Sequence, residues 1–356
     1  MKYLNLQGNL IFYVSRFALL SVSKLEILIS DITGLCCYTE ASKCFPEFID
    51  DLASCSNIIK HDFVRYLFWI IAIASLGENI IGLVALSIFS SNNNKIITIK
   101  YNKSRKLIHQ MYRKNLIGSD ILISLYFFAL LAADMIYDGH FITSSNWKKT
   151  IFCKILSFVS LLAYEVSLVI VCILAVDRLV AVCLPFRQQW LGVKASKFLV
   201  LSSWLLCAGV CFIPMYDLHI RQKAMSNAMC SSLLDINILH WVVTLIYIIN
   251  SITVVSNCII YIIIVKVVKA GKLPTAYSSK RQSRESSLTL RIVFVILAAG
   301  CCWIAVSTVA VLQILDITIS SNVFVLSTVI VYATGPILNP ILNIFSTKEM
   351  IKLFSR

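Results

Sequence analysis

A single carboxylate, Asp120, interrupts an apolar run in the second of several long hydrophobic stretches. Such a group must be protonated, paired or bound to a cation, because an isolated charge is costly to bury near lipid. Asn79, Ser167 and Asn339 are polar residues of other stretches at a similar depth, and they could converge on Asp120. This pattern predicts either a sodium site, with Asp120 as the metal ligand, or a plain interhelical hydrogen-bond network.

A second charged group closes the third stretch, where Asp177 and Arg178 are adjacent. Arg178 can pair with its neighbour or reach Glu285, which begins the sixth stretch at the same level. A contact between Arg178 and Glu285 would hold the inner ends of two helices together, and breaking it would release them. Charged residues at such positions mark relays, pathways or switches.

Two further features lie in the last two stretches. Pro340 removes a backbone hydrogen bond and kinks the seventh stretch, and the flanking Asn339 and Asn343 can satisfy the carbonyls that it frees. Trp303 places a large ring deep in the sixth stretch, where a packed core tryptophan is the simplest interpretation.

The elements that position these residues are membrane helices. Hydrophobic residues make up 58% of the 356 residues and charged residues only 14%, and a spanning helix needs roughly 20 mostly apolar residues. We therefore expect an all-α membrane protein, a bundle of seven transmembrane helices in the lipid bilayer. The predicted spans are Phe63–Phe89, Asn115–Tyr137, Ile151–Leu184, Phe198–Tyr216, Ile238–Val265, Leu288–Leu315 and Val323–Phe345.

The net charge of +14 predicts the orientation. Basic residues concentrate between the first and second spans, between the fifth and sixth, and in the tail. By the positive-inside rule these segments are cytoplasmic and the N-terminus is outside. A basic chain also suggests nucleic-acid binding, but here membrane topology explains the charges, so no nucleic-acid partner is expected.

Six of the 13 cysteines fall on the predicted outer side. A bridge between Cys153, at the start of the third span, and Cys230, in the outer loop after the fourth, would tether that loop to the helix. The other four outer cysteines allow three pairings, although adjacent residues are unlikely to bond each other. They are Cys36, Cys37, Cys44 and Cys55.

The chain divides into four predicted regions. Residues 1–35 contain a partial leucine-rich repeat, in which Leu4–Ile11 supplies alternating apolar residues and a turn asparagine, and Leu25, Ile27 and Ile29 supply a weaker second strand. A signal peptide with an apolar core at Leu10–Val22 is the alternative. One or two repeats cannot bury a core, so we expect a truncated repeat array. Three regions follow: a Cys-rich hinge (36–62), the receptor domain (63–345), and a short amphipathic helix with the C-terminus (346–356).

Together these residues resemble the rhodopsin-like G-protein-coupled receptors from about Phe63 to Phe354, and within them the leucine-rich-repeat hormone receptors of the relaxin-receptor branch. The residues that carry the resemblance are the Cys36-Cys37 hinge, Glu165-Val166-Ser167, Asp177 with Pro185-Phe186-Arg187, Cys302-Trp303-Ile304, Glu285 and Asn339-Pro340-Ile341-Leu342.

The resemblance implies a role for individual residues. Asp120 is similar to the family's sodium-site acid, with Na⁺ the only cofactor implied. Arg178 resembles the G-protein switch arginine, Glu285 its lock partner and Trp303 the toggle. Tyr261 resembles the tyrosine that meets the arginine in the active state.

The chain also departs from the family pattern. Ala305 stands where a sixth-helix proline is usual, and Asn343 replaces the tyrosine that ends the seventh-helix motif. Glu78 and Gly335 replace a glycine and a sodium-site asparagine, and the first inner loop, Ser90 to Lys114, is long. We expect these departures to reduce the efficiency of G-protein activation.

The resemblance implies a plasma-membrane receptor that senses an extracellular peptide or protein hormone and activates a heterotrimeric G protein. A non-signalling decoy or orphan receptor of the same fold is the main alternative. A light sensor would need a lysine in Val323–Phe345, which has none, and a transporter would show internal repeats. An enzyme is not expected, because the spans contain no His/Glu metal-binding pair and no nucleophile–base arrangement.

Overall fold

The fold is that of a computed structural model of the chain. The structure describes residues 2–9, 25–31, 33–38, 42–45, 53–92, 100–138, 147–183, 191–220, 227–231, 240–270, 304, 307–308, 311–312, 317, 323, 327 and 335–339.

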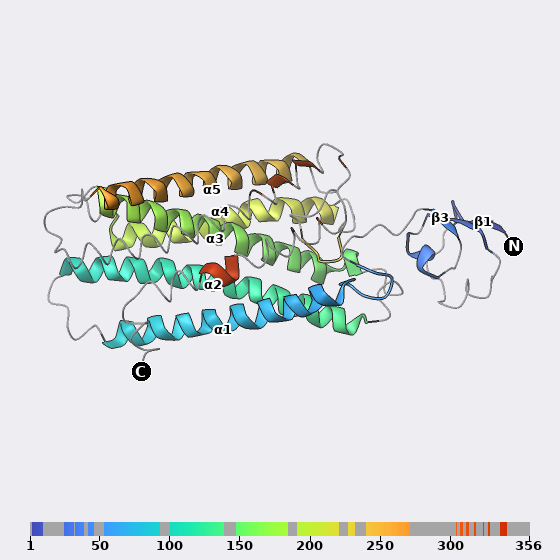
Figure 1. Cartoon of the computed structure of the whole chain (residues 1–356), viewed down its shortest axis with the longest axis horizontal. Coiled ribbons are helices and arrows are strands. Elements are labelled where there is room, and N and C mark those ends of the chain that lie inside the picture. The colour runs from blue at the N-terminus through green and yellow to red at the C-terminus, as the bar shows by residue number, and fades with distance from the viewer. Residues whose placement is uncertain are drawn as a thin grey trace.

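Five long α-helices lie side by side along the long axis of the molecule (Figure 1). All five are long and apolar enough to cross a membrane. A helix satisfies its own backbone hydrogen bonds, which lipid cannot do, so long apolar segments fold this way. The helices are α1 (Asp62–Asn92), α2 (Lys100–Ile136), α3 (Ile151–Cys183), α4 (Val193–Ile220) and α5 (His240–Lys269).

The first five predicted spans coincide with these helices, with one clear difference. Helix α2 begins at Lys100, inside the predicted first inner loop and well before the predicted start at Asn115. Ile108 and Tyr112, four residues apart, are buried against Val166 of α3 and Val200 of α4. This polar segment is therefore an amphipathic helix, which a search for uniformly apolar runs does not detect. Most of the sixth and seventh predicted spans lies outside the described residues.

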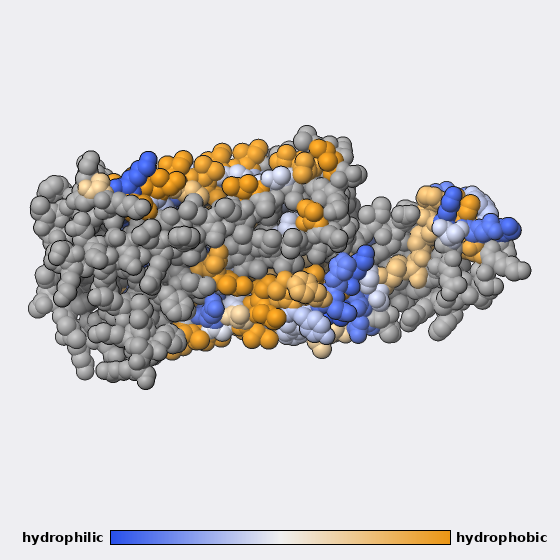
Figure 2. All heavy atoms as spheres, in the orientation of Figure 1, coloured by the Kyte–Doolittle hydropathy of each residue, from blue (hydrophilic) through white to orange (hydrophobic). Residues whose placement is uncertain are grey.

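Helix α3 is central in the described part of the bundle: it packs against α2, α4 and α5, and α1 packs against α2. Large aliphatic side chains remain exposed on the outer faces, as on α1 and α5 in Figure 2. On α5, Ile248, Ile252, Val255 and Ile259 recur every three or four residues, which places them on one helix face. An apolar outer face is what a lipid environment requires.

Beyond one end of the bundle, the N-terminal residues form a small parallel sheet (Figure 1). Its strands are β1 (Tyr3–Asn5), β2 (Ile27–Ile29) and β3 (Lys43–Phe45), in that order. Tyr3 pairs with Ile27, and Ile27 with Lys43. The 3₁₀ helix η1 (Thr33–Tyr38) separates β2 from β3.

The core of this sheet is centred on Leu28. Leu28 is fully buried with Leu25 and Leu35, whereas its neighbours Ile27 and Ile29 are only partly buried. Successive side chains of a strand point to opposite faces, so Leu28 lies on the core face of the sheet and its two neighbours on the other. The turn asparagine is placed as expected, with Asn9 Nδ2 donating to the Leu6 carbonyl at 3.1 Å. The assignment as a leucine-rich repeat stays a prediction.

Two disulfides select one of the three possible hinge pairings. Cys36 bonds Cys44, and Cys37 bonds Cys55. Because Cys44 lies in β3, the first part of the predicted hinge is also the third strand of the sheet. The second bridge connects η1 to the segment that leads into α1.

Candidate functional site

Asn339 joins three parts of the bundle in a buried polar cluster. Its Nδ2 donates to Asp120 Oδ1 of α2 and to Ser167 Oγ of α3, both at 3.0 Å. Asp120 is fully buried, and Ser167 and Asn339 are 8% exposed. Residues 335–339 are helical. Three of the four residues predicted to converge are thus in direct contact.

Asn79, the fourth, is placed beside this cluster without a bond to Asp120. Its Nδ2 donates to the Ser75 carbonyl at 2.9 Å and reaches the Pro336 carbonyl at 3.5 Å. The hydroxyl groups of Ser75 and Ser124 are hydrogen-bonded to each other, with their Oγ atoms 2.8 Å apart. Ser124 Oγ also donates to the Asp120 backbone carbonyl at 3.0 Å. Two serines that the sequence analysis did not name therefore connect α1 to the Asp120 turn.

The cluster presents oxygen atoms suited to a hard cation. Asp120 Oδ2 and Asn79 Oδ1 are buried and have no hydrogen-bond partner among the described residues. Carboxylate, amide and hydroxyl oxygens are the ligands that such cations prefer. Within the described ranges no group of three or more His, Cys, Asp or Glu side chains gathers. The candidate is therefore a site with one carboxylate.

Near the C-terminal end of α3, which is predicted to be the inner end, Asp177 pairs with a histidine. His109 Nε2 of α2 lies 3.2 Å from Asp177 Oδ2, and both side chains are mostly buried. His109 belongs to the amphipathic start of α2. It was not predicted as a site residue, because this segment was expected to be a loop. Tyr261 of α5 is buried against Ala175 of α3, three residues before Arg178.

Several predicted switch residues lie outside the described part of the chain. They are Glu285, Trp303, Pro340 and Asn343. The contact between Arg178 and Glu285 and the roles of Trp303 and Asn343 therefore stay predictions.

A second acidic residue of α3 bonds to α5. Asn250 Nδ2 donates to Glu165 Oε1 at 2.7 Å. Glu165 was predicted only as part of a motif, without a role of its own. The signal was available, since an acid within a membrane span suggests a functional site and needs a partner.

At the other end of α3, the end predicted to be outside, a disulfide joins Cys153 and Cys230, the pairing expected from the sequence. The loop around Cys230 is also held by aromatic side chains. Trp147 Nε1 donates to the Ala228 carbonyl at 2.8 Å, and Tyr126 donates to the Met229 carbonyl at 2.7 Å. The loop is thus fixed to both α2 and α3.

The segment that follows the hinge is fixed to the same end. Asp134 of α2 accepts a bond from the Ile59 amide at 2.9 Å and pairs with Arg65 Nε of α1 at 2.6 Å. Ala53, Ile58 and Ile59 are buried in the core that contains Cys230. The bridge from Cys37 to Cys55 therefore links the N-terminal sheet to a docked segment.

Comparison with known proteins agrees with this arrangement. The model of the 7 transmembrane receptor (rhodopsin family) matches residues 92–342, more than half of the chain. The chain belongs to this family. It is a multi-pass membrane receptor, and Asp120, Ser167, Asn339 and the Asp177-Arg178 pair lie within the matched region.

Relatives of this receptor include hormone receptors. It is 20% identical to the G-protein coupled receptor GRL101 of Lymnaea stagnalis, over 93% of this chain and 29% of that protein. It is 20% identical to human relaxin receptor 2, over 85% and 39%, and 21% identical to the lutropin-choriogonadotropic hormone receptor of Gallus gallus, over 89% and 41%. The chain thus spans well under half the length of these relatives.

Proposed function

We propose that this receptor senses an extracellular peptide or protein hormone and activates a heterotrimeric G protein. The observation that carries the proposal is the bond from Asn339 to both Asp120 and Ser167. One amide there links the seventh predicted span to α2 and α3, so a change at one helix is transmitted to the others. The names of its relatives, two of them hormone receptors, support the class of ligand.

The proposed location is the plasma membrane, with the N-terminus extracellular. The disulfides of the N-terminal region and the bridge from Cys153 to Cys230 favour an oxidising outer side. The basic loops predicted on the opposite side support the same orientation. The sheet and hinge are then available to an extracellular ligand.

The inner ends of α2, α3 and α5 form the proposed G-protein side. Asp177 has His109 as a partner, so the pairing of Asp177 does not require Arg178. Arg178 is then available to exchange between Glu285, Tyr261 and the G protein. A hormone that binds one of two bundle arrangements more tightly shifts the population toward it.

We also propose that the Asp120 cluster holds Na⁺. Asp120 Oδ2, Asn79 Oδ1 and Ser167 Oγ are the oxygens that would hold it, and its charge would balance that of the carboxylate. Asn339 keeps Asp120 and Ser167 together, so binding there would favour the present arrangement of α2 and α3.

GDP–GTP exchange on purified G proteins of each class tests the proposed function. Receptor in nanodiscs should accelerate exchange on at least one class, and Arg178→Ala should abolish the effect. Lys194→Ala, at the exposed start of α4, is the matched control and should behave as the unchanged receptor. No acceleration on any class, with or without hormone, would favour the non-signalling decoy receptor.

A further inference from the structure

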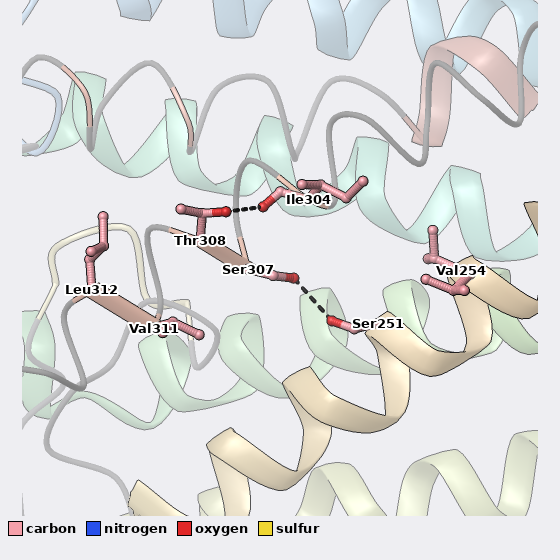
Figure 3. A pocket seen from close by; sticks show the side chains of 8 residues that line it. Ser251, Val254, Ile304, Ser307, Thr308, Val311 and Leu312 are labelled. Atoms are coloured by element: carbon pink, nitrogen blue, oxygen red, sulfur yellow. Dashed lines mark hydrogen bonds between the residues drawn. The ribbon is translucent and has the colours of Figure 1, made fainter.

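A groove with a volume of about 300 Å³ lies between α5 and the described residues of the sixth predicted span (Figure 3). Val254 and Val255 form its α5 side, and Ile304, Val311 and Leu312 form the other. The described residues of the sixth span are helical, and their spacing of three and four places them on one helix face.

The groove contains one pair of hydroxyl groups. Ser251 Oγ and Ser307 Oγ lie 3.2 Å apart and point toward each other across the groove (Figure 3). Each hydroxyl has one hydrogen, and a bond between the two uses only one. The second hydrogen can therefore donate to a ligand oxygen. Thr308 is different, because its Oγ1 already donates to the Ile304 carbonyl at 2.8 Å.

The groove opens toward the hydrocarbon of the bilayer. All its α5 residues lie within the apolar segment Leu245–Val267. Val255, Val311 and Ile304 are 52%, 51% and 62% exposed, so the rim belongs to the outer surface of the described helices. In a membrane receptor that surface meets lipid, which is the available source of a ligand.

We propose that this groove binds a sterol. The side chains that line it are aliphatic or carry a hydroxyl, so nothing there matches a charged headgroup or the many polar groups of a peptide. A phospholipid acyl chain would fill the apolar part but offers no oxygen to the serine pair. A sterol combines a rigid apolar body, which suits branched aliphatic walls, with a single hydroxyl.

A bound sterol would contact both α5 and the sixth span, which the serine pair already joins. Since a ligand stabilises the arrangement to which it binds, sterol content would adjust the separation of these two segments. This effect does not depend on the identity of the hormone or on G-protein activation.

Photolabelling of the full chain in nanodiscs with a diazirine analogue of cholesterol tests the proposal. Labels should map to peptides containing Val254–Val255 and residues 304–312, and excess cholesterol should prevent the labelling. Val311→Trp fills the groove and should reduce labelling at least about fivefold. Ile259→Trp is the matched control, because Ile259 is an equally exposed α5 residue outside the groove, and its labelling should be unchanged.

The hydroxyl contact has its own test. Replacing both serines, Ser251→Ala with Ser307→Ala, should weaken competition by cholesterol about fivefold, as expected for one lost hydrogen bond. Competition by cholestane, which has the same rings without the hydroxyl, should not change. Labelling that does not saturate, equal labelling by a phosphatidylcholine probe, or cross-linking of two receptor copies through this groove would each overturn the proposal.

Discussion

At the scale of single residues, Asn339 shows how much one amide can organise. Both of its Nδ2 hydrogens are used, one toward Asp120 and one toward Ser167. The sequence predicts that polar residues of apolar spans converge, because they avoid lipid. It does not predict that Asn79 turns to a backbone carbonyl at Pro336 instead, since every residue offers such an acceptor and no residue type marks it.

The Asp120 cluster leads to the first prediction. Sodium at ten times its dissociation constant should stabilise the receptor by about 1.4 kcal/mol, because it binds only the folded state. Replacing potassium in the buffer with sodium at equal ionic strength should therefore raise the melting temperature of the purified receptor. Asp120→Asn should remove the difference, whereas Thr253→Ala, whose exposed hydroxyl bonds only its own helix, should keep it. A sodium effect that survives in Asp120→Asn would exclude this site.

The second prediction concerns Asn343, which is shorter than the tyrosine usual in the family. It cannot span the distance of a large side chain toward Tyr261 or Arg178, so we expect weak signalling by the natural receptor. Asn343→Tyr should increase the maximal response in a dose–response measurement at matched surface expression. Equal or reduced output would show that this receptor does not use that switch.

At the scale of elements, the helix ends around Cys153 and Cys230 are joined by more bonds than the sequence indicates. The cysteine pattern predicts the bridge from Cys153 to Cys230. It does not predict that Trp147 and Tyr126 hold the same loop, because a carbonyl acceptor has no sequence signature. The pairing of Arg65 with Asp134 was likewise missed, since the two residues are 69 positions apart.

The third prediction concerns this loop. Cys230→Ala should lower surface expression, because losing a disulfide costs about 2–5 kcal/mol in small secreted domains. Cys230 also has a positive φ of 53°, which glycine adopts without strain. Cys230→Gly should therefore be less harmful than Cys230→Ala, and Cys172→Ala, a free cysteine, should have no effect. Normal expression of both Cys230 variants would show that the bridge is dispensable.

The fourth prediction concerns the docked hinge segment. Arg65→Ala leaves the buried Asp134 carboxylate without its charged partner and should destabilise the receptor by about 2 kcal/mol. A thermal-melting series of Arg65→Ala, Asp134→Asn and the double variant measures the coupling. If the destabilisation of the double variant equals the sum of the two single destabilisations, the ion pair does not stabilise the hinge segment.

At the scale of the whole molecule, the sequence predicts the described spans well and the N-terminal region less well. Span length follows from the thickness of the bilayer, so α1, α3, α4 and α5 begin and end within a few residues of their predicted limits. The buried start of α2 was missed because its apolar residues occupy one face only. In the sheet, Leu28 rather than its neighbours is buried, since three consecutive apolar residues do not indicate which side faces the core.

The central claim, that this receptor couples to a G protein, is tested most directly by complex formation. A receptor that promotes exchange and a guanine nucleotide each weaken the other's binding to the G protein. The nucleotide-free G protein therefore binds the receptor tightly, and added nucleotide weakens the complex. Receptor in nanodiscs should therefore retain a heterotrimer on a size-exclusion column after nucleotide removal, and excess GTP should release it. Arg178→Ala should retain none. A receptor that binds hormone but retains no G protein of any class, or retains it regardless of GTP, would contradict this account.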